Sequence, residues 1–312
     1  MDRLRRFPGR PIPTGSVAQR HLELQVLRRI GFYGFTERYG WKPGDPPFAI
    51  DWIRPMPNSL DIAVRPDALP EAIGALLPML VPGSEPTGVR GLRPRLTPHG
   101  VELSRIGLPG MVCLRGVRLR AWQRALDISM KIWDDPDETL LLWRTHPDVM
   151  HPDEEDIARS CDAGYAPASE GCDDVAAAAS IVLRRQMIFR GVTDIRVWTN
   201  PGSIQLEWYG GDDHAAVAGA LLDPVFGMPG SVDAPCTCHD SGANRCWSVE
   251  LDFVANPGGY VNLRRGGADW TDRLEQSSEK ARQRRSAELR PAWAGLPAAP
   301  SNHNRQGLSM SV

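Results

Sequence analysis

The sequence predicts an α+β protein built as a tandem duplication of an α-β-β-α-β-β-α unit, with antiparallel sheets of the ferredoxin-like or permuted-plait kind. Three observations lead to this prediction. Short sequence blocks recur in the same order in both halves, their apolar periodicity alternates between that of helices and that of strands, and the differences in length fall in expected loops. The first unit covers residues 20–133 and the second covers residues 174–289.

Each unit is expected to begin with an amphipathic helix. Val26-Leu27-Arg28-Arg29 recurs as Val182-Leu183-Arg184-Arg185, and both blocks come late in a stretch whose apolar residues follow the helical period. The recurrence gives the starting point for aligning the two halves.

A strand, a tight turn and a second strand should follow this helix. Residues 53–62 match residues 197–206 when Pro57 and Ser59 are aligned with Pro201 and Ser203. Apolar and polar residues alternate after each turn, so one face of the sheet should meet the core and the other should meet water.

A second helix is marked by Gly74-Ala75-Leu76-Leu77 in the first half and by Gly219-Ala220-Leu221-Leu222 in the second. Each copy leaves this helix through a Pro-Gly-Ser triplet, at residues 82–84 and 229–231. Since Pro and Gly favour turns, a loop is expected at both places.

A second hairpin and a third helix complete each unit. Val101-Glu102-Leu103 matches Val249-Glu250-Leu251 on the hairpin, and Trp122 then matches Trp270 on the helix. Chance is the competing explanation for short matches of this kind, and their shared order along the chain favours duplication.

Three segments lie outside the two units. Residues 1–19 are expected to form a disordered basic arm, residues 134–173 an acidic Pro-rich linker, and residues 290–312 a disordered tail. Within the linker, Leu140-Leu141-Leu142-Trp143 should form a short strand or a segment docked on a domain.

Composition excludes several classes of protein. The 312 residues carry 36 basic and 38 acidic side chains for a net charge of -2, so binding to nucleic acid through bulk charge is not expected. No apolar run reaches the ~18 residues of a membrane span, and the N-terminus lacks the apolar core of a signal peptide. A cytoplasmic location is therefore expected. Only three of the basic residues are lysines, which indicates a GC-rich coding genome.

The sharpest group of ligand-type residues is Cys236, Cys238, His239 and Cys246, which could supply four ligands to a zinc ion. The Cys-x-Cys spacing fits zinc poorly, however, and reduced loop thiols or a disulfide such as Cys236 to Cys246 are alternatives. Because the first half has no cysteine in the equivalent loop, any metal would belong to one copy. The expected cofactor is therefore none, or zinc.

Two further groups combine histidine with carboxylates. Asp212, Asp213 and His214 follow a pair of glycines, where they could act in acid–base catalysis or, more simply, cap a helix. The repeated triplets at residues 146–148 and 151–153 read His-Pro-Asp, which favours turns and a helix cap over metal or acid–base chemistry.

Other features have simple structural interpretations. The arginines of residues 90–95 form a basic loop that could hold a phosphate, although no phosphate-binding glycine motif accompanies them. Cys113 should be a small core residue. The tryptophans expected on strands, Trp52, Trp198 and Trp208, should fill the core, with a ligand cleft as the alternative.

These observations favour a non-catalytic intracellular binding protein whose duplicated units hold a protein partner or a small ligand. The alternative is a cytoplasmic enzyme acting on a small molecule in a cleft between the repeats, with the groups around His214 or the cysteine loop as reactive residues. A nucleic-acid regulator ranks third, since no reader helix is evident. Membranes are not expected as partners.

Overall fold

The computed structural model describes residues 15–32, 46–80, 86–131, 139–145, 147–155, 172–200, 203–223, 227, 230–232, 246–251 and 259–266. Its first half contains α1 (Val17–Phe32), η2 (Pro47–Ala49), β1 (Ile50–Met56), β2 (Ser59–Val64), α3 (Leu69–Leu76), β3 (Leu92–Thr97), β4 (Gly100–Arg105), β5 (Met111–Arg115) and α4 (Leu119–Lys131). After α5 (Leu142–Thr145), the second half contains α7 (Cys172–Arg184), η3 (Gln186–Phe189), β6 (Val192–Asn200), β7 (Ser203–Gly210), α8 (His214–Leu221), β8 (Gly230–Val232), β9 (Cys246–Leu251) and β10 (Gly259–Gly266).

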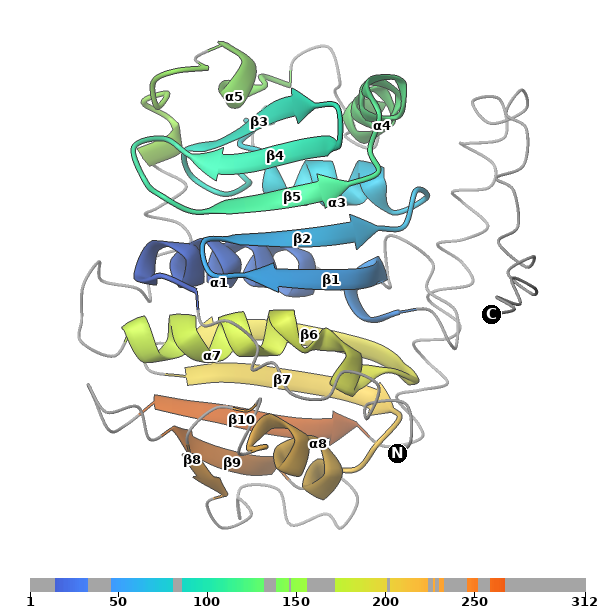
Figure 1. Ribbon diagram of the computed structural model, residues 1–312, viewed down its shortest axis with the longest axis vertical. Helices are drawn as coiled ribbons and strands as arrows, with labels where there is room; N and C mark the ends of the chain where they lie inside the picture. The colour runs from blue at the N-terminus through green and yellow to red at the C-terminus, as the bar shows by residue number, and fades with distance from the viewer. Residues whose placement is uncertain are drawn as a thin grey trace, which may run out of the picture.

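Two five-stranded sheets with the same pattern of strand order form the body of the molecule (Figure 1). Their orders are β1-β2-β5-β4-β3 and β6-β7-β10-β9-β8. β2 pairs with β5 in parallel, and β7 pairs with β10 in parallel, whereas all other pairs are antiparallel. The fold is therefore α+β with mixed sheets. The expectation of purely antiparallel sheets is wrong for the central pair, because a long crossover through α3, β3 and β4 separates β2 from β5.

Each sheet has one strand more than expected. β3 and β8 lie where loops were predicted after the second helix of each half, so the arginines of residues 90–95 belong largely to an edge strand. Pro94 interrupts the apolar alternation of β3 and hides the strand in the sequence. An edge strand tolerates proline because one side of its backbone has no ladder partner.

The predicted hairpins and the described helices agree with the structure. Met56 lies opposite Ser59 at the first turn, and Asn200 lies opposite Ser203 at the equivalent turn in the second half. α1, α3 and α4 lie at the positions expected for the three helices of the first unit, and α7 and α8 match the first two of the second unit. Trp270 and the expected third helix of the second unit lie outside the described residues.

The first folded element begins earlier than the expected boundary at residue 20. α1 starts at Val17, and Gln19 is buried, with its side-chain amide bound to both the backbone N–H and the carbonyl of Met111. In the linker, Leu140 forms a bridge with Leu80, and the helical turn of α5 follows it directly. The apolar run is therefore docked on the first half.

α1 and α7 lie side by side where the two sheets meet (Figure 1). α1 also contacts β6 of the second sheet, and α7 contacts β1 of the first. At this junction the buried carboxylate of Glu23 accepts hydrogen bonds from Arg184 at 2.7 and 2.8 Å and from the Ser180 hydroxyl at 2.6 Å. One apolar core runs through both halves. None of the described helices is both long and apolar enough to cross a membrane.

Candidate functional site

A row of polar side chains crosses all five strands of the first sheet. Each member lies directly opposite the next in strand register, and directly opposed residues point to the same face of a sheet. The row runs Arg54 (β1), Asp61 (β2), Cys113 (β5), Glu102 (β4) and Arg95 (β3). The residues on either side of it in the sequence point to the opposite face, where the buried side chains of β2, β4 and β5 join the apolar core. We call the face that carries this row the polar face.

Two arginines hold the central carboxylate of the row. Asp61 is buried, and its Oδ2 accepts from the Nε of Arg54 at 2.9 Å and from its Nη2 at 2.5 Å, while its Oδ1 lies 2.9 Å from the Nη2 of Arg115. Burial alone would raise the pKa of Asp61, but the hydrogen bonds and charges of Arg115 and Arg54 hold that pKa below its usual value. Asp61 is therefore ionised at neutral pH.

Cys113 occupies the middle of the row. It is buried, as expected, but it lies on the polar face and not in the apolar core cluster. Burial and the nearby charge of Asp61 raise the pKa of the Cys113 thiol to about 11. A nucleophilic cysteine needs the opposite environment, one that favours the thiolate. The row can therefore present charge to a partner, but its thiol is not activated for covalent chemistry.

Large apolar side chains lie exposed beside Arg54 on the polar face. Trp52 and Met56 are each two residues from Arg54 on β1, and they are 45% and 44% exposed. The expectation that Trp52 fills the core is wrong, because its place in the strand alternation puts it on the face opposite the apolar core. Trp208 is fully buried, as expected.

The second sheet also carries charged residues in register. Arg196 on β6, Glu207 on β7 and Arg264 on β10 lie opposite one another, and the Nε of Arg264 lies 3.4 Å from the Glu207 carboxylate. By register, the positions of Arg54, Asp61, Cys113 and Glu102 correspond to Trp198, Gln205, Asn262 and Ser248. These four are uncharged, so the charged residues of the second sheet lie two positions farther from the first turn than those of the first sheet.

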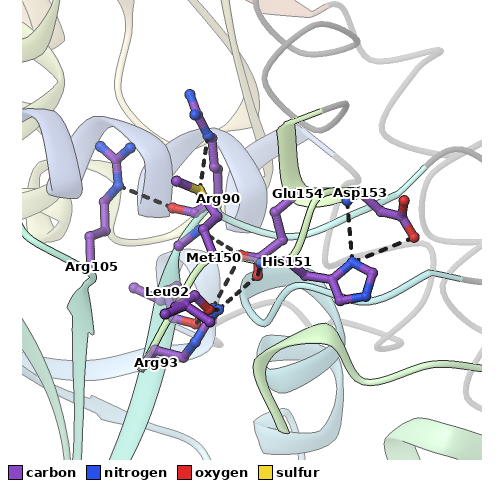
Figure 2. Close-up of polar contacts among 10 residues, drawn as sticks. Arg90, Leu92, Arg93, Arg105, Met150, His151, Asp153 and Glu154 are labelled. Atoms are coloured by element: carbon purple, nitrogen blue, oxygen red, sulfur yellow. Dashed lines mark hydrogen bonds and ion pairs between the residues drawn. The ribbon is translucent and has the colours of Figure 1, made fainter. Parts of the chain in front are cut away.

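A second polar cluster ties the linker to the edge of the first sheet (Figure 2). Glu154 is fully buried, and its carboxylate accepts from Arg93 at 2.7 and 3.1 Å, from the Gly91 N–H at 2.8 Å and from the His151 N–H at 3.0 Å. Burial would raise the pKa of Glu154, but Arg93 and these two N–H groups hold it below its usual value. The Nη2 of Arg93 also donates to the Val149 carbonyl.

Each arginine of residues 90–95 is held in an ion pair by the folded structure. Arg90 pairs with Glu155, Arg93 with Glu154 and Arg95 with Glu102. The imidazole of His151 accepts from the backbone N–H of Asp153 at 3.2 Å, which is the contact of a turn. Asp148 belongs to the same described segment, residues 147–155, whereas His146 lies outside the described residues.

Asp212, Asp213 and His214 lie at the start of α8. The Asp213 carboxylate caps this helix by accepting from the Ala216 N–H at 2.8 Å, and the Asp212 carbonyl accepts from the indole N–H of Trp208. The Nε2 of His214 accepts from the backbone N–H of Arg265 at 3.0 Å. These contacts agree with the helix-capping interpretation.

The cysteine loop lies mostly outside the described residues. Cys236, Cys238 and His239 are not described, while Cys246 begins β9 opposite Arg264. Within the described part of the chain, no group of three His, Cys, Asp or Glu residues is arranged to hold a metal ion.

Sequence reasoning missed the polar face. Its charged residues lie on five strands and are separated by up to about sixty positions, and no local motif links them. The available signal was the alternation after the turn at residues 57–59, which puts Asp61 on the face that meets water.

Comparison with protein-family models, with curated proteins and with solved structures finds no match to this chain.

Proposed function

We propose that the protein is a non-catalytic intracellular binding protein that holds its partner on the polar face of the first sheet. The observation that carries this proposal is the exposure of Trp52 and Met56 beside Arg54. Aromatic residues, methionine and arginine are the types enriched in protein interfaces, and a tryptophan left in water on a folded sheet is a common mark of a contact surface.

The chemistry of the row supports binding over catalysis. Asp61 is held ionised between two arginines, and the Cys113 thiol is kept protonated, so neither group is tuned as an acid, base or nucleophile near pH 7. The alternative, an enzyme acting on a small molecule between the repeats, gains no comparable support from the described contacts of His214.

Photo-crosslinking in cells tests the proposal. A benzophenone amino acid in place of Trp52 should give an adduct of higher mass on irradiation, whereas the same group in place of Arg120, which is exposed on α4, should not. Equal adducts at both positions, or none at position 52, would contradict a binding role for this face.

We also propose that the two halves arose by duplication of one unit, for which a permuted plait is the nearest simple description. The matching strand orders and the matching turns at Ser59 and Ser203 support this. When the two halves are superposed in a crystal structure of the full chain, Trp122 should lie over Trp270. A second half whose helix does not overlay that of the first would argue for separate origins.

We also propose that Cys236, Cys238, His239 and Cys246 bind a zinc ion. Protein purified without chelators should contain about one equivalent of zinc, and binding should weaken at low pH because the ligands must lose protons. Zinc-free protein from such a preparation would reject the site.

A further inference from the structure

The charge that the polar face exposes to solvent differs from the sum of the formal charges of its residues. The row and its neighbour Arg115 contain three arginines and two carboxylates, which nearly balance. Exposure is very uneven, however. The side chains of Arg54 and Arg95 are 64% and 77% exposed, whereas those of Asp61 and Glu102 are 2% and 20% exposed. The guanidinium groups cover the carboxylates, so the accessible charge of this face is positive.

Both exposed arginines keep donors for a second acceptor. Arg54 uses its Nε and Nη2 on one oxygen of Asp61, and Arg95 uses the same two atoms on one oxygen of Glu102. In the contacts of the described residues, the Nη1 of neither arginine is engaged. Since a guanidinium carries five N–H donors in a planar fork, each arginine can bind a further carboxylate while keeping its own ion pair.

The apolar residues beside Arg54 set the pattern of what can bind. Trp52, Arg54 and Met56 alternate on one face of β1, so neighbouring members of this trio are about 7 Å apart. An extended peptide has the same repeat. A segment lying over β1 can therefore place a carboxylate on Arg54 and apolar side chains on Trp52 and Met56.

From these observations we infer that the polar face binds an extended acidic protein segment, in which an Asp or Glu has an apolar residue two positions away on each side. The inference rests on the proposed function, because it names the partner of the same face. A nucleic acid fits less well. Its backbone carries dense, continuous negative charge, whereas each exposed arginine here already neutralises a carboxylate, and the whole chain has a net charge of -2.

Selection from a random dodecapeptide library displayed on phage, with the full-length protein as bait, tests the inference. Enriched peptides should contain the acidic residue with its two apolar neighbours. A synthetic, fluorescein-labelled copy of an enriched peptide should bind at least tenfold more weakly to Arg54→Gln and to Trp52→Ser, and replacing its acidic residue by the amide should cause a similar loss. High salt should also weaken binding, because the contact is charged and exposed.

Matched variants on α4 serve as controls. Arg120→Gln and Leu119→Ser remove one exposed guanidinium and one exposed apolar side chain from another element, and both should bind the peptide like the wild type. Arg54→Gln removes a partner of the buried Asp61 and can disturb the sheet around it. Trp52→Ser breaks no ion pair, so a loss of peptide binding in this variant tests the binding face independently.

Three results would overturn the inference. The first is that the selection enriches no peptide. The second is that enriched peptides bind Arg54→Gln and Trp52→Ser as tightly as the wild type, and the third is that a labelled oligouridine binds the wild type but not Arg54→Gln. An adduct at position 52 in the crosslinking experiment, combined with any of these results, would leave the proposed function standing and reject only the acidic segment as partner.

Discussion

Arg93 on β3 and Glu154 on the linker form a buried ion pair, with 2.7 Å between the Nη2 and Oε1 atoms. Their side chains are 10% and 0% exposed. Glu154→Gln should lower the free energy of unfolding by about 3–5 kcal/mol, the cost of breaking a buried pair. The Gly91 and His151 N–H groups bind different oxygens of the carboxylate, so the single amide oxygen can accept from only one of them. Urea denaturation measures this change. Glu155→Gln, in an exposed pair with Arg90, should cost less than about 1 kcal/mol.

The same contact gives a pH dependence with a defined sign. The pKa of Glu154 is lower in the folded protein than its ordinary value of 4.5, so its contribution to stability is present above that value and is lost as pH falls through the folded-state pKa. The stability difference between wild type and Glu154→Gln should therefore be constant near neutral pH and shrink below about pH 4.5. A difference that persists unchanged at pH 3 would show that Glu154 is not held ionised.

Cys113 should react slowly with iodoacetamide. Because the pKa of its thiol is about 11 instead of 9.0, the thiolate fraction at pH 8 is about 100-fold smaller than in the unfolded chain, and burial limits access further. Mass spectrometry of the peptide containing Cys113 should show alkylation at least 100-fold slower in native buffer than in urea. Similar rates in both conditions would mean that the strand opens readily or that the thiol is not buried.

At the scale of elements, two glycines in helices should respond oppositely to alanine. A Cβ on Gly31 of α1 would lie 2.8 Å from the Cβ of Val197 on β6, whereas a Cβ on Gly219 of α8 would meet nothing within 4 Å. Alanine favours helix by up to about 1 kcal/mol over glycine. Gly219→Ala should therefore raise stability by about 0.5–1 kcal/mol.

Gly31→Ala should instead lower stability by about 1–3 kcal/mol, because overpacking at the contact between α1 and β6 outweighs the gain in helix propensity. Thermal or urea denaturation of the two variants side by side measures both effects. If both variants were stabilised to the same extent, α1 would not approach the second sheet as closely as described.

At the scale of the whole molecule, the junction between α1 and α7 should make the two halves unfold as one cooperative unit. Alanines on α7 allow the helices to approach closely, and Arg184 spans the junction to Glu23 and to the carbonyl of Met56. Arg184→Met leaves the buried Glu23 carboxylate without its guanidinium, so it should cost about 3–5 kcal/mol.

Unfolding of Arg184→Met should still be a single transition, because one core spans both halves. Hydrogen exchange followed by mass spectrometry can monitor β4 and β7 separately, and both strands should lose protection at the same urea concentration. Glu23→Met combined with Arg184→Met should regain part of the loss by replacing the pair with apolar contacts. Separate midpoints for the two strands would show that the halves fold independently.

Much of the element order is readable in the sequence because its signals are local. Helical periodicity around residues 22–30 and 175–182 indicates the first helix of each half, and the Pro and Ser positions at residues 57–59 and 201–203 indicate the hairpin turns. Asp213 as a helix cap follows equally from its immediate neighbours. The edge strand β3 was missed for a local reason too, since Pro94 and three arginines look like a loop.

Tertiary structure alone decided the parallel pairing of β2 with β5 and everything that depends on it. Arg54, Asp61, Cys113, Glu102 and Arg95 form one row only because four separate strand registers bring them into line. Arg93 and Glu154 lie 61 residues apart in the chain and meet only because the linker docks on β3. Such contacts depend on long-range packing of the backbone, which no pattern of neighbouring residues encodes. The row on the candidate binding face consists of contacts of this kind.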